Sequence, residues 1–341
     1  MSTNRRTFIK QTVMAGVGAG VLPNLPFTGF AHTATATGKR IGIIGLDTSH
    51  STSFTNLLND AATGDKFKGY KIVAAYPYGS RDIESSASRI PGYITQVQGK
   101  GVQIVQSIAE LLPLVDVVLL ETNDGRLHKQ QAMEVLQSGK RMFIDKPIAN
   151  SMGDAMAIFE EARKKNVPIF SSSSLRYTEG IEEVLSGKKI GKIIAADAYS
   201  PAKLEKTHTD FYWYGIHGVE MLFTAMGAGC KTVTRFHQDN MDVVVGVWND
   251  GRIGTFRGTR AGKALYGGTI FGESGNAMYG AYSYERLLHK IIEFFETGVP
   301  PVAAADTLEI CAFIEAAQKS KLNGGKPVEI ADVFRQYRYK P

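Results

Sequence analysis

Short apolar runs separated by helical patterns fill the chain from residue 38 to about residue 170. The runs lie at 41–45, 71–76, 115–120, 141–144 and 167–170. Apolar runs without polar alternation are typical of strands that are covered on both faces. The segments between them, at 51–58, 108–112, 128–138 and 151–166, place apolar residues at helical spacing. This alternation predicts an α/β fold in which the N-terminal part forms a Rossmann-type, doubly wound parallel sheet.

From residue 171 the pattern changes to strand-rich segments followed by long helical ones. Strands are expected at 193–199, 232–236, 243–248, 252–257 and 268–271, and helices at 217–225, 284–297 and 306–322. Asn249-Asp250-Gly251 is a strong hairpin signal between two of these strands. We therefore expect a C-terminal α+β domain with a largely antiparallel open sheet, one face of which the three helices cover.

The first 36 residues have a pattern of their own. Arg5-Arg6-Thr7-Phe8-Ile9-Lys10 precedes a weakly apolar, glycine-rich run at 12–22, and Ala34-Thr35-Ala36 offers a small-residue cleavage site. The segment resembles a bacterial twin-arginine signal. It predicts export of the folded chain to the periplasm by the twin-arginine machinery. Because the usual clients of that route acquire a cofactor before export, the signal also indicates a tightly held cofactor.

Composition and charge narrow the class of protein. The 341 residues are 43% hydrophobic and 21% charged, as in soluble globular proteins. Of the net charge of +6, Arg5, Arg6 and Lys10 supply three in a signal without acidic residues, so the rest carries only +3. We expect no nucleic-acid partner from this balance. Cys230 and Cys311 are the two cysteines, and the sequence leaves open whether they pair or are separate buried thiols.

Several short motifs occur in an order that resembles one oxidoreductase family. They are Glu121-Thr122-Asn123 with His128, Phe143-Ile144-Asp145-Lys146-Pro147, Gly215-Ile216-His217, Thr297-Gly298-Val299-Pro300-Pro301 and Glu315-Ala316-Ala317. Together they resemble the glucose-fructose oxidoreductase, inositol dehydrogenase and MocA (Gfo/Idh/MocA) family. The resemblance implies an NAD(P)-binding Rossmann-like domain at 38–170 and a substrate-binding and oligomerisation domain at 171–341. It also implies NADP or NAD as the cofactor and a homo-oligomeric assembly.

The first loop of the predicted dinucleotide site departs from the usual glycine pattern. A G-x-G-x-x-G turn lets the backbone approach a pyrophosphate, but here its positions are Gly45, Asp47 and His50. A carboxylate at the second position repels phosphate unless it turns away to cap the helix. Thr48 and Ser49 offer hydroxyl and backbone donors instead, with His50 as a candidate phosphate partner.

Other residues are expected to contact the cofactor. Ser80 and Arg81 follow the second strand, where an NAD enzyme usually has an acidic residue, and they suit a ribose 2′-phosphate and hence NADP. Arg81 reads equally well as a solvated loop charge. By the resemblance, the loop after the fourth strand and the Asp-Lys-Pro triplet add further contacts. These are Glu121, Asn123, His128, Asp145 and Lys146.

Two residues are expected to carry the chemistry. Lys146 matches the family's lysine, whose ammonium holds a substrate hydroxyl and stabilises the alkoxide that forms as hydride leaves. His217 matches the family's histidine, which suits proton transfer because its ordinary pKa lies near neutrality. An aspartate of the family's motif is replaced here by Trp213. Without the family resemblance, Lys146 would be interpreted as an ordinary solvated lysine and His217 as a packed polar residue.

Substrate contacts are expected where the chain crosses between the domains. Arg176, Tyr177, Trp213 and Tyr214 are the candidates, together with His217. Arg176 suits substrate hydroxyls or a carboxylate, and it suits an interdomain salt bridge equally well. The aromatic residues offer a stacking wall for a sugar, although such groups more often fill cores. We identify no metal site in the sequence.

The sequence predicts an exported NAD(P)-dependent oxidoreductase that acts on a small carbohydrate-like substrate, namely a sugar, glycoside or polyol. Two alternatives stay open. One is cofactor-assisted glycoside cleavage through a transient keto-sugar, with no net redox change. The other is a non-catalytic binding protein that keeps the fold with a degenerate cofactor site, as the altered glycine loop and Trp213 suggest.

Overall fold

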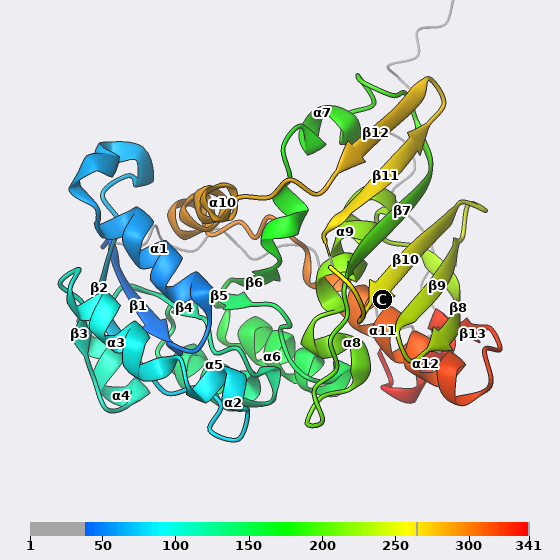
Figure 1. Ribbon diagram of the computed structural model, residues 1–341. Coiled ribbons are helices and arrows are strands. Elements are labelled where there is room, and N and C mark those ends of the chain that lie inside the picture. The colour runs from blue at the N-terminus through cyan, green and yellow to red at the C-terminus, as the bar shows by residue number, and fades with distance from the viewer. Residues whose placement is uncertain (1–37, 264, 340–341) are drawn as a thin grey trace, which may run out of the picture.

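The computed structural model describes residues 38–263 and 265–339, so the expected export signal lies outside the described residues. Two sheets organise this part of the chain, and each has its own set of covering helices (Figure 1). Within these residues, no helix is long and apolar enough to span a membrane.

The first sheet has six parallel strands, which confirms the Rossmann-type prediction. Its spatial order is β3-β2-β1-β4-β5-β6. The strands are β1 Arg40–Ile44, β2 Lys71–Tyr76, β3 Gln103–Ile104, β4 Val117–Leu120, β5 Met142–Asp145 and β6 Ile169–Ser172. The order reverses between β1 and β4, both of which are buried. Ligands of doubly wound sheets bind outside the carboxyl ends of the strands at such a reversal.

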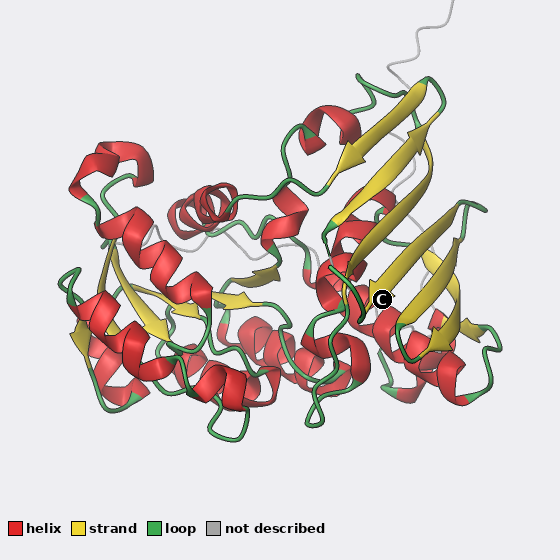
Figure 2. Ribbon diagram, in the orientation of Figure 1, coloured by secondary structure: helices red, strands yellow, loops and turns green. Residues whose placement is uncertain are grey.

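Helices cover both faces of this sheet (Figure 2). One face packs against α1 Ser49–Asn59, α3 Ile90–Gln98 and α10 Tyr284–Thr297, and the other against α4 Ile108–Leu111, α5 Gly125–Gln137 and α6 Met152–Lys165. The shorter elements are η1 Ala61–Phe67, α2 Glu84–Ala87 and η2 Leu112–Leu114. Because the strands are covered on both sides, their carboxyl ends and the loops after them are the part of the sheet open to a ligand.

Helix α10 lies on a different sheet from the one that we expected. Its residues Leu288 and Phe294 share a core with Phe143 and Phe170 of the first sheet, and the Phe170 and Phe294 rings are 4.9 Å apart. The prediction that this helix covers the second sheet is therefore wrong. An apolar helical stripe shows that a helix is buried on one side, but it does not identify the sheet that receives it.

The second sheet is mixed and mostly antiparallel, with the order β12-β11-β7-β10-β9-β8-β13, and only β7 and β10 pair in parallel. Its strands are β7 Ile193–Pro201, β8 Cys230–Gln238, β9 Met241–Trp248, β10 Ile253–Thr259, β11 Gly267–Gly272, β12 Gly275–Tyr279 and β13 Val328–Glu329. The predicted turn joins β9 to β10, where Gly251 has φ +85°. The left-handed backbone explains the glycine there.

Helices cover one face of the second sheet, and they include the expected segments at 217–225 and 306–322. They are α8 Asp210–Trp213, α9 Ile216–Met226, α11 Ala304–Leu322 and α12 Ile330–Gln336, while η3 Ser174–Tyr177 and α7 Ile181–Leu185 connect the two sheets.

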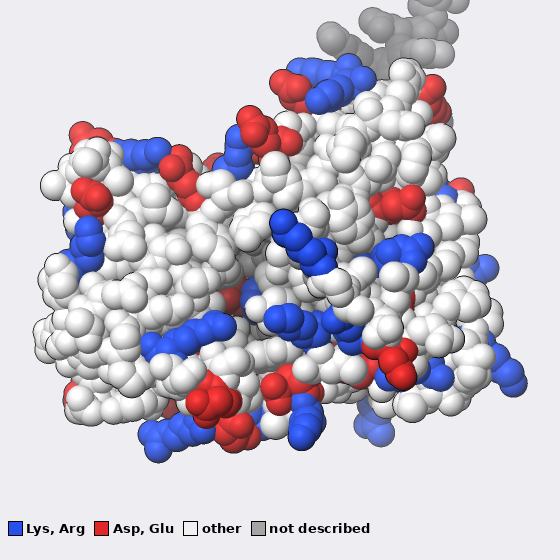
Figure 3. All heavy atoms as spheres, in the orientation of Figure 1, with Lys and Arg blue, Asp and Glu red and all other residues white. Residues whose placement is uncertain are grey.

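Cys230 and Cys311 are buried free thiols, so they do not pair. On the face in Figure 3, several basic side chains lie across the middle, and acidic and basic side chains lie side by side along the lower edge.

Candidate active site

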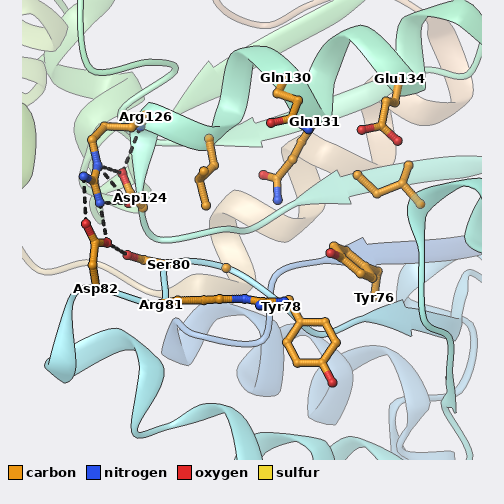
Figure 4. Close-up of a pocket in the computed structure, with 13 residues that line it drawn as sticks. Tyr76, Tyr78, Ser80, Arg81, Asp82, Asp124, Arg126, Gln130, Gln131 and Glu134 are labelled. Carbon is orange, nitrogen blue, oxygen red and sulfur yellow. Dashed lines mark hydrogen bonds and ion pairs between the residues drawn. The ribbon is translucent and has the colours of Figure 1, made fainter.

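Two cavities lie at the carboxyl edge of the first sheet. The larger, about 600 Å³, lies between the loop after β2 and the N-terminal half of α5 (Figure 4). The narrower, about 90 Å³, lies between the N-terminus of α1, the loop after β5 and the second domain. Its lining residues are Thr48, Ser49, His50, Arg89, Asn123, Lys146, Ser174, Leu175, Tyr214, His217, Tyr266, Tyr282 and Tyr284. The position matches that expected for a ligand at a topological switch point.

The loop between β1 and α1 turns its carboxylate away from the cavities. Gly45 has φ +92°, and a Cβ there would lie 2.5 Å from the Thr122 backbone, so this position accepts only glycine. Asp47 is fully buried, and its carboxylate accepts hydrogen bonds from the backbone N–H groups of Ser80 (3.2 Å) and Asn123 (3.0 Å). Burial raises the pKa of Asp47 to about 6. Asp47 thus joins three loops and does not cap the helix.

The N-terminus of α1 is open to an anion. Thr48 is the N-cap residue, and its side chain accepts from the His50 N–H at 3.5 Å. The first turn of the helix contains no acidic residue, and Ser49 is exposed. Since the positive end of a helix dipole and its free N–H groups favour anions, this turn suits a pyrophosphate even though the second and third glycines are missing.

The larger cavity contains a network that the sequence did not reveal. Arg126 donates to the carboxylates of Asp82 and Asp124, with one nitrogen 3.0 Å from Asp82 Oδ2 (Figure 4). This pairing lowers the pKa of Asp82 to about 2. Ser80 donates to Asp82 at 2.8 Å, and the Arg81 guanidinium lies 5.2 Å from the Tyr78 ring centroid. Ser80 and Arg81 both line this cavity, as expected for residues that contact the cofactor. In the sequence, only Asp124, as a possible N-cap residue of α5, pointed to the network.

Two expected cofactor residues, Asn123 in the loop after β4 and His128 at the start of α5, have different positions. Asn123 lines the narrow cavity, and its side chain donates to Ser86 at 2.9 Å. His128 lies below the loops, where its ring nitrogens contact the carbonyls of Thr122 at 2.6 Å and Ile148 at 3.3 Å. Burial lowers the pKa of His128. It lines neither cavity and holds the loop after β4 against the loop after β5.

Lys146 and His217 come from different domains and line the same narrow cavity. Lys146 follows β5, and His217 lies in the first turn of α9. The His217 Nδ1 atom is 2.8 Å from Ser173 Oγ. Burial, and then the positive charge of Lys146, holds the pKa of His217 well below its usual value, so the imidazole is neutral at pH 7.

The expected substrate residues divide into two groups. Tyr214 lines the narrow cavity, together with three tyrosines that no sequence motif indicated, Tyr266, Tyr282 and Tyr284. The others lie elsewhere. Arg176 donates to Glu220 at 2.9 Å, Trp213 is buried with its ring centroid 4.9 Å from that of His208, and Tyr177 lines a separate cavity beside α7.

Beneath the narrow cavity, three ionisable side chains meet. The His50 Nδ1 atom lies 3.1 Å from Asp145 Oδ2 and 3.7 Å from Glu121 Oε2. Burial acts to lower the pKa of His50, but the two carboxylates outweigh it and raise this pKa to about 9. Burial raises the pKa of Glu121 to about 7. We expected His50 to bind a phosphate of the cofactor, but its Nδ1 atom faces two carboxylates.

Comparisons with known proteins agree with this architecture. Residues 39–173 match the GFO_IDH_MocA family, described as an oxidoreductase family with an NAD-binding Rossmann fold. The 1,5-anhydro-D-fructose reductase of Ensifer adhaerens is 30% identical over 122 residues, which are 34% of this chain and 36% of that protein. Dehydrogenase aclE of Aspergillus oryzae is 27% identical over 165 residues, 46% of this chain and 43% of that protein. The matches thus span less than half of these curated relatives.

Solved structures resemble the chain over most of its length. A probable dehydrogenase from Thermotoga maritima has a TM-score of 0.69 at 19% identity, covering 86% of this chain and 99% of that one. The myo-inositol dehydrogenase of Lactobacillus casei, in complex with NAD(H) and myo-inositol, has a TM-score of 0.67 at 16% identity, covering 85% and 96%. At these identities the likeness shows that the two-domain fold is shared.

Proposed function

We propose that this protein belongs to the Gfo/Idh/MocA oxidoreductase family, which the comparisons support, and that it is an exported NAD(P)-dependent oxidoreductase. It transfers hydride between a tightly bound nicotinamide cofactor and a ring carbon of a sugar, glycoside or polyol. One observation carries the proposal: Lys146 and a neutral His217 line a single cavity beside the open N-terminus of α1.

The residues at the sheet edge fit a dinucleotide. The larger cavity has the size and polar lining for an adenosine, with Ser80 and Arg81 next to its ribose. Thr48 and Ser49 present the helix N-terminus to the pyrophosphate. The residues of the narrow cavity near Lys146 would then hold the nicotinamide end. When bound, the cofactor supplies the hydride acceptor or donor.

The chain itself supplies the proton chemistry. The Lys146 ammonium donates to the substrate oxygen and stabilises the negative charge that develops on it. In the tautomer whose Nδ1–H donates to Ser173 Oγ, the Nε2 lone pair of His217 accepts the hydroxyl proton. The low pKa of His217 keeps that lone pair available at neutral pH.

The substrate side of the cavity suits a polyhydroxylated ring. Tyr214, Tyr266, Tyr282 and Tyr284 offer hydroxyl groups for hydrogen bonds and ring faces for the C–H surface of a sugar. The names of the similar proteins, which include an anhydrofructose reductase and inositol dehydrogenases, support the same substrate class.

Two further parts of the proposal concern the cell and the assembly. The twin-arginine pattern supports export to the periplasm with the cofactor already bound. The uncovered face of the second sheet exposes Phe236, Ile253 and Met278, which supports a homo-oligomer. Light scattering on the purified protein gives the subunit number, and a monomer at micromolar concentration would contradict this part.

Turnover tests the chemistry directly. Sugars and polyols are screened for cofactor reduction in a single-turnover assay, followed by the nicotinamide absorbance. Lys146→Met and His217→Gln should each lower the rate of hydride transfer at least about 100-fold while nucleotide binding persists. Lys188→Met, an exposed lysine after α7 that lines neither cavity, is the matched control. Unchanged hydride transfer in either active-site variant would refute the role of that residue.

A further inference from the structure

The three ionisable side chains beneath the narrow cavity form a compact group, which we call the buried triad. They are His50 in the first turn of α1, Glu121 directly after β4 and Asp145 at the end of β5. Glu121 and Asp145 are fully buried and His50 is 4% exposed. One ligand atom from each lies within 4.8 Å of those from the other two. The carboxyl ends of the adjacent strands β4 and β5 and the first turn of α1 thus bring two carboxylates and an imidazole together.

The carboxylates of the triad have too few partners. None of the four oxygens of Glu121 and Asp145 accepts a hydrogen bond from any residue within 38–263 or 265–339. The Nδ1 atom of His50 is close to both groups, yet neither contact has hydrogen-bond geometry. Lys146 Nζ lies 3.8 Å from Asp145 Oδ2. Since folded proteins pair nearly all buried polar atoms, four such oxygens in one place make a candidate cation site.

A proton on His50 does not meet this need, because one N–H satisfies one lone pair. A divalent ion accepts several ligands at once. With metal–ligand bonds of about 2.1 Å, ligand atoms in octahedral or tetrahedral sites lie roughly 3.0–3.5 Å apart. The separations of His50 Nδ1 from Asp145 and Glu121, 3.1 Å and 3.7 Å, are close to that range, and the ligand atoms of Glu121 and Asp145 lie within 4.8 Å of each other.

We propose that the buried triad binds one divalent transition-metal ion of the Zn²⁺ or Mn²⁺ class through His50 Nδ1, a Glu121 oxygen and an Asp145 oxygen. The mixture of one imidazole and two carboxylates selects this class, because Mg²⁺ and Ca²⁺ favour oxygen ligands alone and softer ions favour thiolates. Neither cysteine of the chain belongs to the triad.

The ion has a positioning role for the neighbouring lysine. Asp145 is adjacent to Lys146 in sequence and 3.8 Å from its ammonium in space. A metal bond to the other side of the Asp145 carboxylate fixes the loop after β5, on which Lys146 stands. It also offsets two negative charges beneath the region where the anionic part of a nucleotide is expected.

Metal binding without any nucleotide tests the proposal, so its outcome is independent of the proposed function. The purified chain is stripped with a chelator and titrated with Zn²⁺ and, separately, Mn²⁺ by calorimetry. One ion of at least one of these metals is expected per chain. Glu121→Gln and Asp145→Asn should each weaken that binding at least about 100-fold. Glu309→Gln, which changes a partly buried carboxylate of α11 that accepts from the backbone N–H groups of Gly229 and Cys230, should bind the metal as the wild type does.

Two further measurements keep the result clear. Circular dichroism of the metal-free variants shows whether they fold. If Asp145→Asn does not fold, the metal titrations of Glu121→Gln and His50→Gln decide whether the triad binds the ion. Substitution with Co²⁺ should give visible absorption that His50→Gln changes. No stoichiometric binding of either ion, or equal binding in the wild type and in every folded triad variant, would overturn the proposal.

Discussion

Both halves of the molecule bury acidic side chains, but they partner them differently. In the second sheet, Asp242 is fully buried and accepts from Arg235 at 2.8 Å, from His237 at 2.7 Å and from Arg260. Although burial opposes it, these hydrogen bonds hold the pKa of Asp242 below its usual value. In the first sheet, the oxygens of Glu121 and Asp145 have no such donors among the described residues.

The contrast separates a structural network from a binding site. Asp242 completes its interactions within the fold, so it secures β8, β9 and the loop after β10 without a ligand. The buried triad leaves its carboxylates incomplete at the carboxyl edge of a parallel sheet, where ligands of this fold bind. Burial alone is therefore uninformative, whereas burial without partners at this edge points to function.

The largest expected effect lies in the structural network. Asp242→Ala leaves the fully buried Arg235 guanidinium without one of its two carboxylate acceptors and removes the acceptor of Arg260, so the free energy of unfolding should fall by about 3–5 kcal/mol. Urea denaturation of the metal-free protein measures it. The exposed neighbour Asp239 provides the control, because Asp239→Ala should change stability by less than about 0.5 kcal/mol. A loss below about 1 kcal/mol for Asp242→Ala would erase the contrast between the two regions.

The next effect concerns the carboxylate that joins the loops of the first sheet. A Cβ at Gly79 would lie 2.1 Å from Asp47 Oδ2, which two backbone donors hold in place. Gly79→Ala should therefore destabilise the protein by about 3 kcal/mol, and by clearly less in the Asp47→Gly background. Gly92→Ala, where a Cβ meets nothing within 4 Å, is the matched control and should be neutral or stabilising. Equal losses for Gly79→Ala in both backgrounds would show that Asp47 is not the obstacle.

A pH effect should follow from the same carboxylate. Burial raises the pKa of Asp47 to about 6 from an ordinary 3.8, so the folded state holds this proton more tightly than the unfolded state does. The stabilisation is complete below pH 4 and is lost as the pH rises through 6. Relative to Asp47→Asn, the wild type should lose about 3 kcal/mol over this window, at about 1.4 kcal/mol for each unit of the pKa difference. Parallel stability curves for the two proteins would contradict the assignment.

The smallest expected effect lies in the triad and completes the comparison. In the presence of a chelator, Glu121→Gln should change the free energy of unfolding by no more than about 1 kcal/mol, because Glu121 accepts no hydrogen bond from the described residues and its loss removes only the attraction to His50, 3.7 Å away. Urea denaturation of Glu121→Gln and Asp242→Ala, measured side by side with the wild type, tests this prediction. A loss as large as that of Asp242→Ala would make Glu121 a structural residue.

Much of the fold could be predicted from the sequence. The unbroken apolar runs at β1, β2 and β4 gave the parallel sheet, since such strands are buried on both faces. The two-residue β3 was not predicted, and the sheet that α10 covers was predicted wrongly, for different reasons. A pair of residues carries no periodicity, and the docking of α10 depends on the sheet face left free by other helices.

The site was predictable in its chemistry and not in its contacts. Lys146 and His217 follow motifs, and the fold brings them to one cavity. Tyr266, Tyr282 and Tyr284 come from segments without a motif, and only tertiary structure places them there. The triad was missed because His50, Glu121 and Asp145 are far apart in sequence and have no metal-ligand spacing. Each was assigned to a nucleotide, and their convergence appears only when three strands lie side by side.

The most direct test of the central claim, that the carboxyl edge of the first sheet is a working dinucleotide site, is native mass spectrometry of the protein purified from the cytoplasm with its signal intact. We expect the mass of the chain plus one NAD or NADP, and the added mass tells the two apart. A bare chain that gains no mass when NAD(H) or NADP(H) is supplied would contradict the account. The altered glycine loop would then have lost its cofactor.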